Sequence, residues 1–126
     1  MKKLIRTTDA PQAIGPYSQA IEANGFVFVS GQIPLDPKTG YLVSGGIREQ
    51  VKQVMENGKA ILEAAGCGMD RVVKTTIYLR NIGDFAAVNE VYGSYFPVDP
   101  PARATVEVSR LPKESEVEID FVAVKD

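Results

Sequence analysis

An Asn-Gly pair between two apolar runs is the feature that most restricts the fold of this chain. Residues 17–23 alternate in the manner of a strand, Asn24 and Gly25 follow, and residues 26–29 read Phe-Val-Phe-Val. Asn-Gly favours a two-residue type I′ turn, because both central residues of that turn need a positive φ. The sequence therefore predicts a β-hairpin whose second strand is apolar at every position, as in strands that are covered on both faces.

The remaining patterns predict two helices and further strands. Apolar residues recur at helical spacing over 47–65, glycines 66 and 68 end this helix, and a second helix extends from an N-cap at Asp84 to about Tyr95. The other strand-like segments are 4–6, 72–79, 102–108 and 116–124. This order of elements predicts one α+β domain over residues 1–126, with a mixed sheet of about six strands and two helices packed on one face.

The other face of this sheet also requires cover. The run over 26–29 is apolar towards both faces, and Val122 and Val124 lie on the face away from Ile119 in the last strand. Both predicted helices are already used, so we expect another copy of the chain to cover these residues. The sequence thus predicts self-association.

Charged residues alternate with small apolar ones along the strand over 102–108. One face carries Ala102, Ala104, Val106 and Val108, and the other carries Arg103, Thr105 and Glu107. We expect the small apolar residues to face the helices and this strand to pair as a hairpin with the last one, so that Arg103 and Glu118 share the far face. Such alternation is commonly a solvated face or a cross-strand ion pair, and the alternative is an arginine that holds an anionic ligand.

Composition excludes several kinds of site. The chain has no histidine and one cysteine, Cys67, so one chain cannot form a Ser-His-Asp or Cys-His arrangement, an HExxH motif or the usual structural zinc sites. Cys67 lies at a predicted helix end, and we interpret it as a bystander. The net charge of −2 and the pI of about 5.2 disfavour nucleic acid as a partner. We recognise no signal peptide and no membrane-spanning run, which predicts a cytoplasmic protein.

Four segments carry a family resemblance that spans essentially the whole chain. They read, in order, "DAPQAIGPYSQA", "SGQIPLDPKTG", "DFAAVNEVY" and "PARATVEVSRLPKESEVEIDFVAV". On these segments the chain resembles the Rid family of reactive-intermediate deaminases, the YjgF type, and in particular its RidA branch.

The resemblance implies a fold, an assembly and a reaction. The fold would be chorismate-mutase-like α+β, in a homotrimer whose three sheets form a central barrel, with active sites in the clefts between subunits. The reaction would be the hydrolytic deamination of 2-imino acids, such as 2-iminobutanoate and 2-iminopropanoate, to 2-keto acids and ammonia. No cofactor or metal would take part.

The resemblance also assigns roles to single residues. Arg103 would clamp the substrate carboxylate, Glu118 would position the attacking water, and Tyr17 would donate a hydrogen bond or close the cleft. The other substrate-binding positions would be Ser30, Gly31, Asn89 and Thr105. Thr105 stands where many family members have cysteine, so a role for a thiol there does not carry over to this chain.

Two other functions are compatible with the sequence. The chain could be a non-catalytic trimeric module that binds 2-keto acids or similar carboxylates with the same arginine. RNA cleavage has been attributed to some relatives, but the acidic pI and the missing histidine argue against it.

Overall fold

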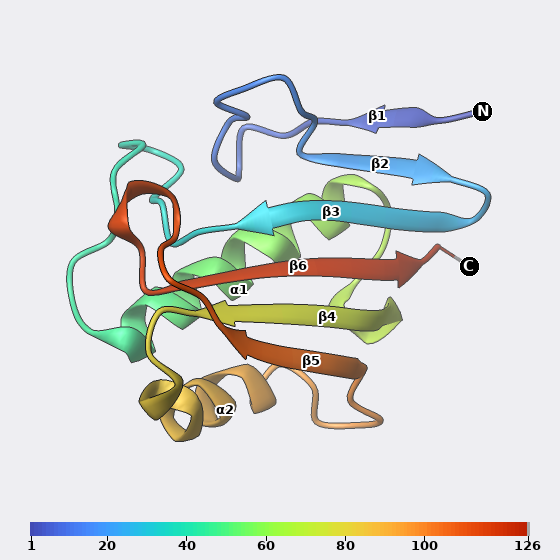
Figure 1. Ribbon diagram of the computed structural model, residues 1–126. Coiled ribbons are helices and arrows are strands. Elements are labelled where there is room, and N and C mark those ends of the chain that lie inside the picture. Colours follow the sequence, from blue (N-terminus) through green and yellow to red (C-terminus); the bar gives the residue numbers. More distant parts are fainter. Residues whose placement is uncertain (126) are drawn as a thin grey trace.

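The computed structural model describes residues 1–125, which form a six-stranded sheet with two α-helices on one side (Figure 1). The strands are β1 (Lys3–Ile5), β2 (Ala20–Ala23), β3 (Phe26–Gln32), β4 (Val72–Leu79), β5 (Ala102–Glu107) and β6 (Val117–Val124). The helices are α1 (Ile47–Ala64) and α2 (Phe85–Gly93), with short 3-10 turns η1 (Met69–Arg71), η2 (Ile82–Asp84) and η3 (Pro112–Glu114). The strand order is β1-β2-β3-β6-β4-β5, so the predicted two-helix, six-stranded mixed sheet is confirmed.

The hairpin predicted from Asn-Gly joins β2 to β3. Asn24 has φ of 54° and Gly25 has φ of 82°, and Ala23 lies opposite Phe26 in the antiparallel register. The two positive φ values are those that a type I′ turn requires.

The end of the sheet differs from the predicted arrangement. β5 pairs parallel with β4, and β6 pairs antiparallel with the other side of β4, so the predicted β5–β6 hairpin is wrong. The reason is α2, because a helix between two strands carries the chain back to begin the next strand in the same direction. β5 therefore lies at the edge of the sheet, beside α2 (Figure 1).

Helix α1 supplies much of the core on the helical side of the sheet. Its fully buried apolar residues are Val51, Val54, Met55, Ile61 and Leu62. Gly58 faces the sheet so closely that an added Cβ would lie 2.5 Å from Cε1 of Phe121 in β6. A glycine in the middle of this helix thus lets α1 approach β6, at the expense of helix propensity.

The C-terminal end of α1 matches its sequence signals. Gly66 follows the helix with φ of 84°, the left-handed conformation that glycine adopts readily. The next residue, Cys67, is half-buried with its Sγ 3.8 Å from the carbonyl oxygen of Val124, and burial raises the pKa of its thiol. These surroundings agree with its interpretation as a bystander.

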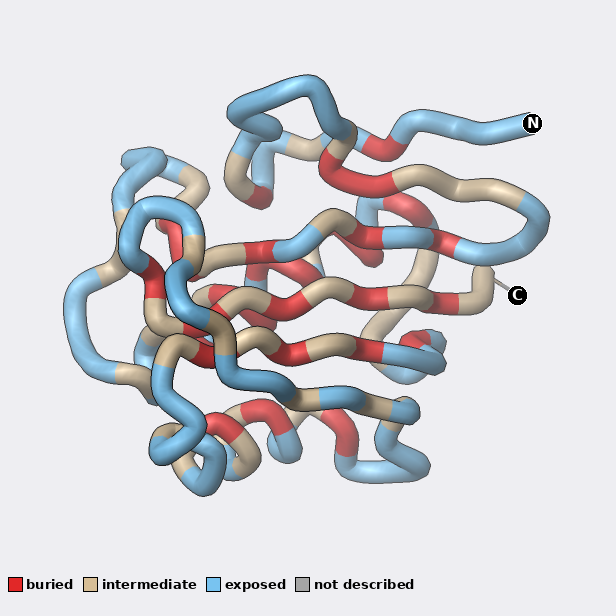
Figure 2. Tube along the Cα trace, viewed as in Figure 1, coloured by how far each residue is buried: buried red, intermediate tan, exposed pale blue. Residues whose placement is uncertain are grey.

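The two faces of the sheet differ in exposure. Along β6, Val117, Ile119 and Phe121 are buried under the helices, whereas Val122 and Val124 on the other face are only partly covered (Figure 2). We call this second face the open face. The open face of β3 exposes Phe26 at 38% and Phe28 at 47%, so within one chain β3 is covered on one face only. Along residues 1–125, no helix combines the length and apolar character needed to cross a membrane.

Candidate functional site

The sequence predicted that Arg103 lies on the open face of β5. In the structure it lies on the helical side. In the parallel register it is opposite Thr75, a fully buried residue of β4 whose hydroxyl reaches α2. The predicted assignment of faces along β5 is therefore inverted: Ala102, Ala104 and Val106 are exposed on the open face, and Arg103 and Thr105 are half-buried on the other. β5 is an edge strand, and the side chains of α2 leave room for the Arg103 side chain between the helix and the strand. The charged residue can therefore lie on the helical side, where the alternation of the sequence predicted apolar residues.

Three side chains of α2 surround the Arg103 guanidinium. Its Nη1 donates a hydrogen bond of 2.7 Å to Oδ1 of Asn89. Its central carbon lies 5.4 Å from the ring centroid of Phe85 and 5.1 Å from that of Tyr92, distances at which a cation is attracted by a ring face. Arg103 forms no ion pair with a carboxylate among residues 1–125. Because an amide oxygen and two rings do not neutralise a full charge, the guanidinium remains available to an anion.

Thr105, two residues along the same side of β5, lies opposite Ile77. Its Oγ1 is buried and has no hydrogen-bond partner among the described residues. The hydroxyl therefore contributes nothing favourable to the fold of one chain, and Thr105 does not reach Asn89 or the Arg103 side chain through a hydrogen bond.

Glu118 lies on the open face of β6, in a cavity of about 380 Å³ between β3, β6 and two loops. The cavity is lined by Ile14, Tyr17, Ser30, Gly31, Ile33, Pro112 and Glu118. The Glu118 carboxyl group lies against the backbone of Gly31, in the space that a side chain would occupy there. The lining is thus apolar at Ile14, Ile33 and Pro112, with one carboxylate and one phenol projecting into it.

The electrostatic surroundings of Glu118 favour its protonated form. Partial burial raises the pKa of its carboxyl group, and the like charge of Asp120, two residues along the same face of β6, raises it further. Tyr78 in β4 lies opposite Glu118 and donates a hydrogen bond of 3.3 Å to Asp120. A carboxyl group with a raised pKa next to a cavity is a candidate for accepting and returning a proton during a reaction.

Tyr17 belongs to the loop that leads into β2. Its side chain is half-exposed, and its hydroxyl accepts a hydrogen bond of 3.3 Å from the backbone nitrogen of Ile14. Ser30 ties this loop to β3, because its hydroxyl donates to the carbonyl oxygen of Ser18 at 2.6 Å. Buried Gln19 holds the start of the loop through hydrogen bonds with the backbone of Thr7 and Pro11. Within one chain, the hydroxyl of Ser30 therefore already binds a backbone carbonyl group and holds the loop against β3.

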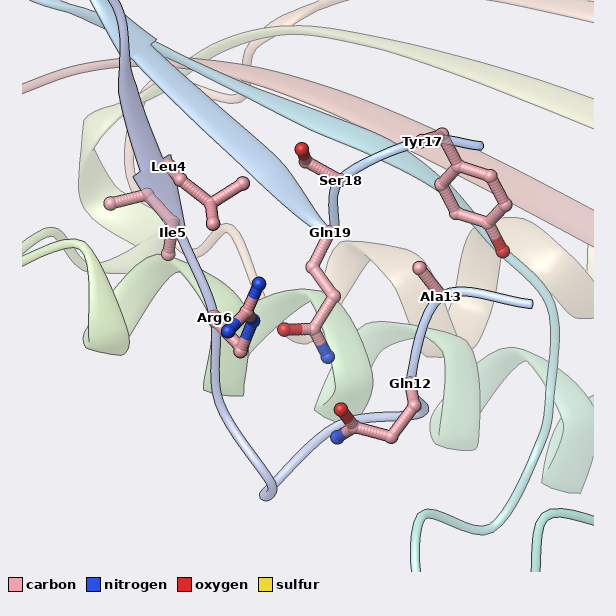
Figure 3. A pocket seen from close by; sticks show the side chains of 8 residues that line it. All are labelled: Leu4, Ile5, Arg6, Gln12, Ala13, Tyr17, Ser18 and Gln19. Carbon is pink, nitrogen blue, oxygen red and sulfur yellow. The ribbon is translucent and has the colours of Figure 1, made fainter. Parts of the chain in front are cut away.

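A second cavity, of about 200 Å³, is lined by residues of β1 and of this loop and shares Tyr17 with the first (Figure 3). The side chains of Arg6, which follows β1, and of Gln12 and Gln19 in the loop point toward the same space. Among residues 1–125, no three His, Cys, Asp or Glu side chains gather in either cavity or elsewhere as a metal-ligand set.

The residues singled out in the sequence therefore fall into two groups on opposite sides of the sheet. Arg103, Asn89 and Thr105 form the helical-side group, and Tyr17, Ser30, Gly31 and Glu118 form the open-face group. Sequence reasoning missed Phe85 and Tyr92 as neighbours of the arginine. Both lie within the second predicted helix, but their contact with Arg103 was not predicted because the two faces of β5 were assigned the wrong way round.

Comparison with known proteins identifies the family. The family model described as Endoribonuclease L-PSP matches residues 7–125. The 2-iminobutanoate/2-iminopropanoate deaminase of Homo sapiens is 50% identical over 125 residues, which cover 99% of this chain and 91% of that protein. The chain belongs to the Rid (YjgF) family. A RutC family protein of Pyrococcus horikoshii matches this Rid chain at 56% identity over the full length of both.

Solved structures agree with this assignment of the Rid chain. RidA from an Antarctic Psychrobacter superposes with a TM-score of 0.93 at 43% identity, covering 97% of this chain and 98% of the other. Escherichia coli TdcF with bound serine superposes with a TM-score of 0.94 at 41% identity, covering 98% and 99%. The resemblance seen in the sequence motifs and the mixed-sheet fold are both confirmed.

Proposed function

We propose that this Rid protein hydrolyses reactive 2-imino acids, such as 2-iminobutanoate and 2-iminopropanoate, to 2-keto acids and ammonia. The proposal is supported by relatives at 50% identity that bear the name of this deaminase and by the two groups of residues described above. Each active site would combine the helical-side group of one chain with the open-face group of another copy.

The placement of Arg103 and Glu118 on opposite sides of the sheet carries the proposal of a shared site. The two side chains of one chain are separated by the sheet itself, so they cannot contact one small substrate together. β5 is an edge strand, and its arginine is close to the rim where a second copy could bring its own Glu118 cavity. A site made by two chains is therefore the arrangement in which both residues can act.

The open face supports the association that such a site needs. It exposes Phe26, Phe28 and Val106, at 38%, 47% and 43%. The homotrimer expected from the family resemblance would cover them, and would have a mass of about 41 kDa, three times that of the chain at 13.7 kDa. Light scattering after size-exclusion chromatography measures this mass directly, and a monomer near 13.7 kDa at micromolar concentration would contradict it.

In the proposed reaction, Arg103 fixes the substrate carboxylate and with it the imine carbon. Its planar guanidinium can bind both carboxylate oxygens and stays charged at any working pH. The open-face group of the other chain would then lie next to the imine carbon. Ser30, Gly31, Asn89 and Thr105 would line the bound substrate around these two groups.

Glu118 would position the attacking water and move the protons. Water adds to the carbon of the protonated imine while Glu118 accepts one proton of the water, which gives a carbinolamine. Glu118 then returns this proton to the nitrogen, the hydroxyl group releases its own proton, and the carbon–nitrogen bond breaks to give the 2-keto acid and ammonia. Tyr17 would donate a hydrogen bond or cover the cleft. Imines hydrolyse readily in water, so positioning supplies most of the modest acceleration that is needed.

A coupled assay tests the function. Threonine dehydratase generates the imine, and the formation of 2-oxobutanoate is followed above the spontaneous rate. We expect Arg103→Ala to reduce turnover by about 100-fold or more, because a mispositioned substrate loses that much. Glu118→Gln should reduce it by about 100-fold or more while the protein still binds 2-oxobutanoate. A wild-type rate in Arg103→Ala would contradict the clamp, and unchanged rate and affinity in Glu118→Gln would contradict the water-positioning role.

Binding without turnover is the second candidate. The relative TdcF was solved with bound serine, a small amino acid whose carboxylate the same arginine could hold in this chain. Calorimetric binding of 2-oxobutanoate without imine hydrolysis would favour this candidate. The family description also names an endoribonuclease, and salt-sensitive RNA binding with cleavage by a highly purified sample would favour that activity instead.

A further inference from the structure

The guanidinium of Arg103 is held by a stripe of side chains on α2. Phe85, Asn89 and Tyr92 are four and three residues apart, the spacing that places side chains on one face of a helix. Two of them present ring faces and the third an amide oxygen to the same guanidinium. The plane of the guanidinium is thus defined from two sides before any ligand arrives.

Tyr92 is itself fixed by a buried contact. Its hydroxyl shares a hydrogen bond of 2.7 Å with Oγ1 of Thr75, which is fully buried in β4. Its ring also packs on Phe96, with 4.9 Å between the ring centroids. Tyr92 is 4% exposed, so it has neither solvent nor free space into which to turn.

These contacts connect Thr75, Tyr92 and Arg103 to one another in a closed set. Thr75 lies opposite Arg103 in the β4–β5 register, Thr75 binds Tyr92, and Tyr92 lies against the guanidinium of Arg103. The backbone of the sheet and the helix are therefore both connected to the position of one cation. Such closure removes the side-chain freedom that an arginine otherwise loses only when a ligand binds.

We infer that Tyr92, anchored by Thr75, is a positioning residue that preorganises Arg103 for a planar carboxylate. Asn89 takes one of the five N–H donors of the guanidinium, and the others remain for a ligand. The rings of Phe85 and Tyr92 orient the guanidinium and bring no negative charge that would compete with a bound carboxylate. This inference rests on the proposed function, and it adds a residue that acts on the substrate only through Arg103.

The test compares Tyr92→Leu with Tyr92→Phe, using calorimetric binding of 2-oxobutanoate to the assembled protein. Tyr92→Leu removes the ring face, and we expect the dissociation constant to rise about tenfold. Tyr92→Phe keeps the ring and loses the anchor to Thr75, and we expect a rise of about two- to threefold. In the coupled assay, KM should rise in the same order, with kcat changing less.

A double-mutant cycle with Arg103→Lys separates positioning from a general loss of structure. A lysine is a point charge without a plane to orient, so Tyr92→Leu should weaken binding less in the Arg103→Lys background than in wild type. An equal effect in both backgrounds would overturn the inference. If Tyr92→Leu fails to fold, Phe85→Leu replaces it, because Phe85 is 38% exposed and its substitution leaves the core intact.

The outcomes distinguish this inference from the proposed function. If Arg103→Ala loses 2-oxobutanoate binding while both Tyr92→Leu and Phe85→Leu bind as wild type does, the positioning role is overturned and the clamp stands. If Arg103→Ala itself binds 2-oxobutanoate as wild type does, the clamp is overturned and the positioning role with it.

Discussion

Replacing Gly31 with alanine tests whether the position of the Glu118 carboxyl group matters. An alanine Cβ would lie 2.8 Å from Cδ and 3.1 Å from Cγ of Glu118, and nearer still to its Oε2. Ordinary contact begins at 3.4 Å, so Cδ has to withdraw by about 0.6 Å and the carboxylate oxygen by more. Because the obstacle is the end of a flexible side chain, it can turn away at a cost of about 0.5–1.5 kcal/mol.

The structure therefore predicts loss of rate with retention of the fold. A displacement of about 1 Å in a reacting group costs on the order of 100-fold in rate, and we expect kcat of Gly31→Ala in the coupled assay to fall by about that factor. The matched control is Gly93→Ala in α2, where an added Cβ meets nothing within 4 Å. This variant should keep its rate and gain up to about 1 kcal/mol of stability.

A double variant shows whether the effect runs through Glu118. If Gly31→Ala acts by displacing Glu118, it should add little in a Glu118→Ala background, because residues that act as a unit are not additive. Wild-type kcat in Gly31→Ala would refute the reasoning, as would a further large loss in the double variant.

Three further predictions concern stability. Glu118→Gln should raise Tm at pH 7, because the raised pKa of Glu118 makes its ionised form unfavourable in the folded chain. The stability that protonated Glu118 contributes to the wild type is complete below the ordinary pKa of 4.5 and is lost as pH rises above that value, so calorimetry below pH 4.5 should show no gain in Tm for the variant. Gly58→Ala should destabilise by about 1–3 kcal/mol in urea titrations, since its Cβ meets the buried ring of Phe121, and a Tm like that of Gly93→Ala would contradict this close packing. Thr105→Val should stabilise by about 1 kcal/mol, because it removes a buried hydroxyl without a partner among residues 1–125; destabilisation would mean that the hydroxyl is satisfied in the assembled protein.

Local signals in the sequence were sufficient for most elements of the fold. Asn24 and Gly25 located the hairpin because only a few residues tolerate positive φ, and the helical spacing over 47–65 located α1 to within one residue. The strand over 72–79 was also predicted with its observed bounds. These features are determined by residues that are close together in the sequence, so they can be predicted without knowledge of the tertiary structure.

The pairing and facing of β5 depend on distant parts of the chain, and these were predicted wrongly. The exposed residues Ala102, Ala104 and Val106 look like core positions, and Arg103 looks like a surface residue. In the structure the apolar residues lie on the open face, and the arginine lies beneath α2. The alternation of residues along β5 indicates that one face of the strand is apolar, but it does not indicate whether a helix or another chain covers that face.

The candidate site was foreseen as a set of residues and not as an arrangement. The family resemblance supplied Arg103 and Glu118, while the structure separated them into two groups on opposite sides of the sheet. Phe85 and Tyr92 fall within the second predicted helix, but apolar residues at helical spacing do not reveal that a cation lies against them. Contacts of this kind follow from the packing of α2 on β5.

The most direct test of a site made by two chains is complementation between two inactive variants. Arg103→Ala and Glu118→Gln are unfolded, mixed in equal amounts and refolded together, and the coupled assay then measures imine hydrolysis. If each site takes Arg103 from one chain and Glu118 from another, random mixing gives intact residues in about a quarter of the sites, and we expect about that fraction of wild-type activity. If the two residues act within the same chain, the mixture stays as inactive as either variant alone, and that result would contradict the account.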